Sequence, residues 1–499
     1  MKKLSFLSTL LLLMMTLSVL VSCSKDDDDD ATDYAVEIKE NGTTSNGSRF
    51  IPIDDTNFYL DGIKYTVEEG HLVVSGYDQA GFKGRAKIVS SILYKNYPYK
   101  VEEIRSRAFQ YCTTLSSVII PNSVKNIGLL VFANCSGLTS VKIGDSVTYF
   151  EYGTFADCSK LANISIPNSI KYIGNSVFKN CSKLTSITIP NSVNEIGGEA
   201  FSGCSKLSSV TIGDSVTKIG YSAFYGCISL TAVNIPNSVK RIGKGAFWGC
   251  SSLTSVVIPN GVTSIEDNAF YGCSNLTSVT IPNSVTKIGE YAFSFCSSLT
   301  TVSIPSSVTY IGYDAFSYCS DLASILVEKD NTKYDSRNNC NAIIETSSNT
   351  LIAGCKNSTI PNGVKRIKAS AFAGCVGLTS LSIPNSVTNI EGGAFFSCTG
   401  LTSLIIPNSV TSIGEHAFEG CTGLTSLIIP NSVTSIGEEA FFDCDIMKDV
   451  YCYSETVPEA GYYAFLPSKD AILHVPAASM EAYKATYPWN CFKNIVAIE

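Results

Sequence analysis

Apolar residues recur along most of this chain with a period of 23 residues. In one full unit, Leu253 to Cys273, Val256 and Ile258 alternate with polar neighbours before Pro259. Alternation with period two is typical of a strand with one buried face, and proline ends a strand because it lacks a ladder donor. Each unit therefore predicts a short strand, a turn and a return, with no stretch long enough for an independent amphipathic helix.

Cysteines mark the period, and a phenylalanine lies three residues before each of them. One such unit cannot bury its apolar face, whereas stacked units share a continuous core. The pattern therefore predicts a solenoid. The marking cysteines are Cys112, Cys135, Cys158, Cys181, Cys204, Cys227, Cys250, Cys273, Cys296, Cys319, Cys375, Cys398, Cys421 and Cys444.

The unit, a Cys followed by Leu-x-x-Val-x-Ile-Pro and Val-x-x-Ile-Gly-x-x-Ala-Phe, resembles the BspA-like, or Treponema-type, leucine-rich repeat over about residues 99–444. The resemblance implies an α/β-type leucine-rich-repeat solenoid dominated by β structure. It implies one long parallel sheet on the inner face and short strands, turns or 3-10 pieces outside. Proteins of this kind are typically surface adhesins that attach to host matrix proteins, host cells or other bacteria.

Both ends of the chain depart from the repeat, as capping segments do. Residues 36–98 predict a small β cap with a hairpin around Asp61-Gly62, and residues 445–499 predict a C-terminal cap. The period breaks once, between Cys319 and Cys375. The polar stretch at about 327–358 predicts a protruding loop on the solenoid rather than a domain boundary.

The first residues predict export. Two lysines precede an apolar stretch that is short for a membrane span, so residues 1–22 are expected to be a signal peptide. Leu20-Val21-Ser22-Cys23 resembles a bacterial lipobox, which implies a lipid anchor on Cys23. The spacer 23–35 contains five consecutive aspartates and resembles the export signal of surface lipoproteins in Bacteroidetes-type bacteria. The resemblance implies an outer-membrane protein exposed on the cell surface; a plain signal peptide and a periplasmic location are the alternatives.

Candidate chemistry is sparse. The 36 basic and 44 acidic residues give a net charge of −8, which excludes the basic footprint of a nucleic-acid-binding protein. We expect no cofactor, no metal and no catalytic activity, and we interpret His416 as an ordinary surface histidine. The repeat cysteines are expected to be buried thiols bonded weakly to backbone. Cys340 with Cys355, and Cys452 with Cys491, are the better disulfide candidates because they lie outside the repeat.

Aromatic residues gather around the Ala-Phe-x-x-Cys turn in the middle of the array. They supply either a binding strip or a ridge that only packs on itself. The residues are Tyr221, Tyr225, Trp248, Tyr271, Tyr291, Phe295, Tyr310, Tyr313 and Tyr318. The sequence thus favours a cell-surface adhesin that binds host or bacterial proteins. A glycan-binding accessory lipoprotein and a passive surface scaffold are the alternatives.

Overall fold

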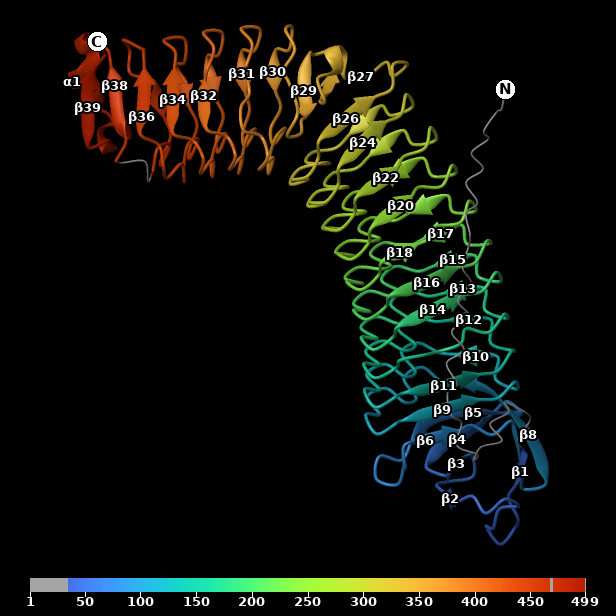
Figure 1. The fold of residues 1–499 in the computed structure, drawn as a ribbon. Helices are drawn as coiled ribbons and strands as arrows, with labels where there is room; N and C mark the ends of the chain where they lie inside the picture. The colour runs from blue at the N-terminus through green and yellow to red at the C-terminus, as the bar shows by residue number, and fades with distance from the viewer. Residues whose placement is uncertain (1–34, 467–469, 499) are drawn as a thin grey trace, which may run out of the picture.

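A computed structural model describes residues 35–466 and 470–498 of the chain. The predicted signal peptide, the lipid site Cys23 and nearly all of the acidic spacer lie outside the described residues. The chain forms a long solenoid that bends once, near the strands β26 (Ser324–Val327) to β29 (Thr350–Ala353), and the bend separates an N-terminal arm from a C-terminal arm (Figure 1). The predicted leucine-rich-repeat class and its dominance by β structure are confirmed.

Most strands of the N-terminal cap form one mixed sheet, whereas β6 pairs parallel with β9 (Ser117–Ile120) of the array. Its predicted hairpin is confirmed, because β3 and β4 pair antiparallel around Asp61-Gly62. The parallel pairing of Ile127 in β10 (Asn126–Ile127) with Ile104 in β8 then connects the cap to the array. The cap strands are β1 (Ala35–Glu37), β2 (Phe50–Pro52), β3 (Asn57–Leu60), β4 (Ile63–Glu68), β5 (His71–Tyr77), β6 (Arg85–Lys87), β7 (Ser91–Tyr94) and β8 (Tyr97–Ile104).

The first half of each repeat contributes a strand to what we term the wide row. Neighbours pair parallel in steps of 23 residues, as in Ser186 with Ser209. The wide row consists of β9 (Ser117–Ile120), β11 (Ser140–Ile143), β14 (Ser186–Ile189), β16 (Ser209–Ile212), β18 (Ala232–Val233), β20 (Ser255–Val257), β22 (Ser278–Thr280), β24 (Thr301–Ile304), β26 (Ser324–Val327), β32 (Ser403–Ile405), β34 (Ser426–Ile429), β36 (Asp449–Cys452), β38 (Ile472–Val475) and β39 (Asn494–Ala497). It is divided into several sheets: residues 163–166 and 380–383 are not in strands, and β18 and β20 are not paired.

The second half contributes a two-residue strand to a narrow row, which is the less interrupted of the two. One sheet runs from β12 to β25, and another from β27 to β37. The narrow row consists of β10 (Asn126–Ile127), β12 (Tyr149–Phe150), β13 (Tyr172–Ile173), β15 (Glu195–Ile196), β17 (Lys218–Ile219), β19 (Arg241–Ile242), β21 (Ser264–Ile265), β23 (Lys287–Ile288), β25 (Tyr310–Ile311), β30 (Arg366–Ile367), β31 (Asn389–Ile390), β33 (Ser412–Ile413), β35 (Ser435–Ile436) and β37 (Glu459–Ala460).

The Ala-Phe turns form the third edge of the solenoid. Phe224 donates its backbone N–H to the carbonyl of Ala246 at 2.8 Å, and Gly226 donates to Trp248 at 2.8 Å. These bonds pair the backbone of one turn with that of the next, as strands do in a ladder. Side chains at equivalent positions are therefore stacked along this edge, 23 residues apart.

The core between the three edges is a column of phenylalanine rings. From Phe109 to Phe316 successive rings lie 5.3–5.6 Å apart, and a second column runs from Phe372 to Phe465. Turns also approach closely at the glycine that follows the narrow strand. A Cβ on Gly243 would lie 2.6 Å from the backbone of Gly220, so this glycine serves close packing rather than a positive φ.

The break at 327–358 is not a protruding loop, and this prediction was wrong. Its strands β27 (Tyr334–Asp335), β28 (Ile343–Glu345) and β29 (Thr350–Ala353) form an antiparallel unit, with a 3-10 turn, η1, over Arg337–Asn339. Alternation along β28 places Ile343 in the core of the N-terminal arm and Ile344 in the core of the C-terminal arm. The buried pattern was hidden in the sequence because its strands are short and lack the 23-residue period.

The C-terminal cap closes the second column of rings. It contains η2 (Ala477–Ser479), the helix α1 (Met480–Ala485) and η3 (Trp489–Cys491). Trp489 is fully buried 4.8 Å from the ring of Phe465, and its Nε1 donates to the carbonyl of Pro458 at 2.9 Å. Among the described helices, none has the length and hydropathy needed to cross a bilayer.

Candidate functional site

A chain of aromatic side chains runs along the outside of the Ala-Phe edge. Tyr225 contacts Trp248 at 5.5 Å between ring centroids, and Trp248 contacts Tyr271 at 5.0 Å. Tyr271 contacts Phe295 at 5.2 Å, and Phe295 stacks on Tyr318 at 4.3 Å with an interplanar angle of 5°. Tyr225, Trp248 and Tyr271 are 23 residues apart, as are Phe295 and Tyr318, but the chain of rings shifts by one position between Tyr271 and Phe295. The structure therefore brings together five of the aromatic residues that the sequence predicted.

The chain of rings continues across the bend to a residue that the sequence analysis missed. Tyr318 contacts Phe396 at 6.5 Å, although 78 positions separate them in sequence. The backbone N–H of Tyr318 donates to the carbonyl of Ala373 at 2.8 Å. Along this edge, the turn before the insert therefore pairs directly with the turn after it. Gly374 makes room, because a Cβ there would lie 2.6 Å from the Tyr318 ring. We term Tyr225, Trp248, Tyr271, Phe295, Tyr318 and Phe396 the aromatic ridge.

The ridge packs on itself and stays accessible at the same time. Trp248 is 36% exposed, and Tyr225 and Phe295 are each 41% exposed. Ring-to-ring packing fixes the side chains and lowers the entropy lost when a partner binds. The two interpretations that the sequence left open, self-packing and a binding strip, are therefore compatible.

The other predicted strip residues lie beside the ridge rather than on it. Tyr221 covers Gly198 of the preceding turn. Tyr291 contacts Tyr313 at 5.7 Å, and the Tyr313 hydroxyl is hydrogen-bonded to Ser370 Oγ at 3.0 Å across the bend. Tyr310 belongs to the narrow strand β25, where the ammonium of Lys287 lies 5.6 Å from its ring.

A partly buried carboxyl group lies next to Tyr313 at the bend. Asp314 lines a small enclosed space with Lys368 and Ser370. Burial raises the pKa of this carboxyl from 3.8 to about 6, and the hydrogen bond from Ser370 opposes the shift. The folded joint therefore disfavours the ionised form of Asp314, although the positive charge of Lys368 also opposes the shift.

The buried repeat cysteines are not a candidate nucleophile or metal site. All 18 described cysteines are free thiols, so neither Cys340 with Cys355 nor Cys452 with Cys491 is bonded. The thiol of Cys452 instead contacts the hydroxyl of Tyr483 at 3.2 Å. Burial raises the pKa of Cys204 to about 12, which disfavours the reactive thiolate. The predicted role of the repeat cysteines, small buried groups bonded to backbone, is confirmed.

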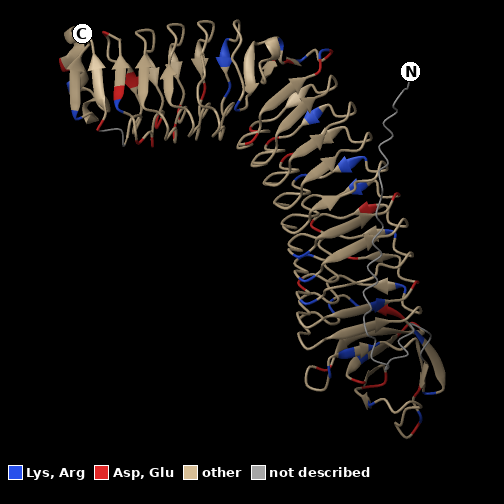
Figure 2. Ribbon diagram, in the orientation of Figure 1, with Lys and Arg blue, Asp and Glu red and all other residues tan. Residues whose placement is uncertain are grey.

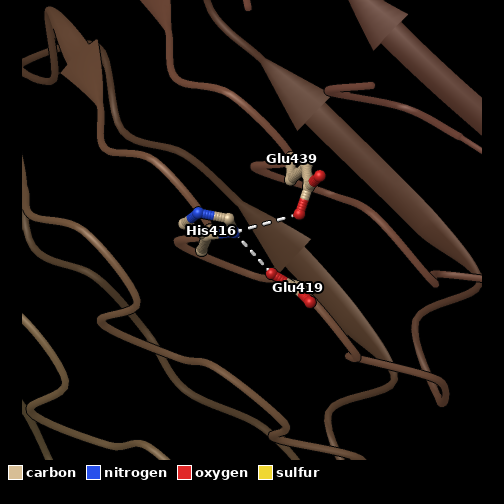
Figure 3. A group of neighbouring side chains, drawn as sticks. All are labelled: His416, Glu419 and Glu439. Carbon is tan, nitrogen blue, oxygen red and sulfur yellow. Dashed lines mark hydrogen bonds and ion pairs between the residues drawn. The ribbon is translucent and has the colours of Figure 1, made fainter. Parts of the chain in front are cut away.

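One cluster contains metal-ligand side chains from two adjacent turns (Figure 3). Nδ1 of His416 lies 2.6 Å from a carboxylate oxygen of Glu419 and 3.3 Å from one of Glu439. The expectation that His416 is an ordinary surface residue overlooked these two partners. The 23-residue step between His416 and Glu439 was the available signal.

The wide row offers a second, flatter surface. Several threonine hydroxyls at the start of its strands donate to a carbonyl of the preceding turn, as Thr277 does to Thr254 at 3.0 Å, and these hydroxyls are structural. In the C-terminal arm, Ile405 is 63% exposed at a position where some other repeats have a hydroxyl, such as Thr280 and Ser382. A shallow groove of about 750 Å³ at this place is lined by Ile405, Ile428 and Tyr453, among others. Charged residues are scattered along the described turns without a continuous basic stripe (Figure 2).

The fold and the ridge define a class of protein, a parallel β-solenoid that presents repeated side chains along its edges. The family model of the BspA type leucine rich repeat region matches residues 102–231, 217–344 and 348–471. The chain therefore belongs to the BspA-type leucine-rich-repeat family, as its repeat pattern predicted. Leucine-rich-repeat proteins are generally protein-binding modules and typically not enzymes.

The chain is also similar to solved structures of bacterial leucine-rich-repeat proteins. A leucine-rich repeat protein from Bacteroides ovatus is 28% identical, with a TM-score of 0.56 and coverage of 89% of this chain and 100% of that chain. A leucine-rich cell surface protein from Faecalibacterium prausnitzii is 26% identical, with a TM-score of 0.43 and coverage of 90% and 96%. The comparison with curated proteins gave no match.

Proposed function

We propose that this protein is a lipid-anchored adhesin of the bacterial cell surface, which binds host or bacterial proteins through the aromatic ridge. The observation that carries the proposal is the continuity of the ridge from Tyr225 to Phe396 across the bend. Rigid, partly exposed aromatic side chains are typical hot spots of protein interfaces. Repetition along an edge also lets one partner engage several turns.

A protein partner fits the ridge better than a glycan. Sugar rings bind flat on exposed aromatic faces, but here the neighbouring rings cover much of each other. The planes of Trp248 and Tyr271 meet at 56°, and the faces of Phe295 and Tyr318 are stacked together. The ring edges and parts of the ring faces remain exposed. Such surfaces suit the mixed apolar and polar surface of a protein partner.

The binding experiment uses the purified full chain on immobilised matrix proteins, mucins and bacterial surface proteins, with a glycan array in parallel. We expect saturable binding to at least one protein, weakened about tenfold or more by Trp248→Ala with Tyr271→Ala. Tyr97→Ala is the matched control, because Tyr97 is an exposed tyrosine of the N-terminal cap. Binding only on the glycan array would favour the alternative function, and binding unaffected by the double substitution would remove the ridge from the account.

Surface location is tested separately. The lipobox-like Leu20-Val21-Ser22-Cys23 and the aspartates after it support a lipid anchor and export. We expect Cys23→Ala to abolish incorporation of labelled fatty acid and to release the protein from membranes. External protease on intact cells should degrade the wild-type protein. Protection from the protease in intact cells would contradict a surface location.

A further inference from the structure

We propose that His416, Glu419 and Glu439 form a binding site for a divalent transition-metal ion of the zinc class. The site is independent of the adhesin proposal. It lies on the same edge as the aromatic ridge, in the C-terminal arm. Three elements of the structure support it: convergent donors, a one-sided charge distribution and a backbone that fixes the spacing.

The three donors converge because two adjacent turns are in register. His416 and Glu439 are 23 residues apart, and the N–H of His416 donates to the carbonyl of Glu438 at 2.8 Å. Both have a positive φ, 56° and 52°, which directs their side chains from equivalent points of successive turns. Glu419 comes from the turn of His416 itself, three residues later (Figure 3).

The donor set selects the kind of cation. Two carboxylate oxygens face one imidazole nitrogen, at 2.6 and 3.3 Å. A single proton on Nδ1 can make only one strong hydrogen bond, whereas a cation among the three atoms can be bound by all of them. A nitrogen donor with carboxylates favours zinc and its neighbours over calcium, which prefers oxygen ligands throughout.

The part of the chain around the three residues is acidic and contains no lysine or arginine that could compete with a metal ion for the two glutamates. Between Lys368 and Lys448 the sequence contains seven acidic residues and no lysine or arginine. For Glu419 and Glu439, His416 is the one ion-pair partner within the described residues. The adjacent groove of about 580 Å³ is lined by Glu415, Glu438 and Glu459. Two carboxylates around one imidazole therefore leave a negative charge that a cation neutralises.

Zinc binding is tested by calorimetric titration of the untagged full chain after treatment with a chelator. A Cys491→Ser background removes a partly exposed thiol that could bind the metal. We expect one zinc ion per chain and visible absorption from bound cobalt without a thiolate band. Glu419→Gln and Glu439→Gln should each weaken binding at least tenfold, because loss of a direct ligand costs no less than loss of a supporting hydrogen bond.

The matched controls are Glu415→Gln and Glu438→Gln, which remove the same charge one residue outside the ligand set. They should change the affinity less than about threefold, and all variants should keep the wild-type unfolding temperature without metal. No zinc binding up to 1 mM, or equal losses in the ligand and control variants, would overturn the proposal. Binding that disappears only with Cys491→Ser would also overturn it, because the thiol would then be the ligand.

Discussion

The thiol of Cys204 donates a hydrogen bond to the carbonyl oxygen of Phe178, which lies 3.1 Å away in the preceding turn. The same bond recurs along the array, as between Cys250 and Phe224 at 3.2 Å. Each cysteine thus joins two turns, because the carbonyl that accepts its thiol also accepts a backbone N–H within its own turn, as Phe178 does from Cys181 at 3.1 Å. The repeat is therefore a unit of hydrogen bonding as well as of apolar packing.

Thiol reactivity should separate the repeat cysteines from Cys491. Burial raises the pKa of Cys204 to about 12, so its thiolate is scarce at pH 8. In the native protein we expect a maleimide to label Cys491 first and the repeat cysteines only after unfolding in urea. Mass spectrometry of the labelled peptides measures this. Rapid native labelling of Cys204 would mean that the turns open locally.

Truncation of one ring in the middle of the column should be strongly destabilising. Phe224 is fully buried between Phe201 and Phe247. We expect Phe224→Ala to cost about 3–5 kcal/mol, because it removes apolar contacts and leaves a cavity. Tyr225→Ala, one residue away and 41% exposed, should cost less than about 1 kcal/mol. Urea midpoints followed by circular dichroism compare the two variants, and similar costs would contradict the column as the core.

The glycine after the narrow strand should resist substitution for steric reasons. A Cβ on Gly243 would meet the Gly220 backbone at 2.6 Å, so Gly243→Ala should cost about 1–3 kcal/mol or more. Gly226 has φ +67° and nothing within 4 Å of the same position, so Gly226→Ala should cost only about 1 kcal/mol. Unfolding temperatures of the two variants measure the difference. A more stable Gly243→Ala protein would refute the close approach.

The joint between the arms should weaken as pH rises. Because the folded-state pKa of Asp314 is raised to about 6, its ionisation opposes folding above pH 6. This cost is relieved as pH falls from 6 towards 4. Asp314→Asn should therefore raise stability at pH 7.5 by about 1 kcal/mol, after allowance for partial exposure, and have little effect at pH 4. Asp330→Asn, at an exposed position of the insert, is the control in thermal unfolding at both pH values. A benefit of Asp314→Asn that is equal at both pH values would exclude its charge as the cause.

The repeat made the solenoid and most of the ridge predictable, because a fixed period places equivalent residues in columns. The bend was not predictable in this way. The insert follows strand alternation instead, with Ile343 and Ile344 facing different cores. Phe396 joins the ridge only because Tyr318 bonds to Ala373 across the insert, a contact outside the 23-residue step. The 23-residue period identifies which residues lie next to each other, but it does not give the direction of their side chains. The convergence of Glu419 and Glu439 on His416 could therefore be seen only in the structure.

The aromatic ridge as the partner-binding surface is tested most directly by the two tryptophans. Trp248 lies on the ridge and is 36% exposed, whereas Trp489 is fully buried in the C-terminal cap. In protein labelled with 5-fluorotryptophan, each residue gives its own fluorine NMR resonance. We predict that a bound protein partner shifts or broadens the Trp248 resonance and leaves Trp489 unchanged. Saturation with a partner while the Trp248 resonance stays as in the free protein would contradict the account.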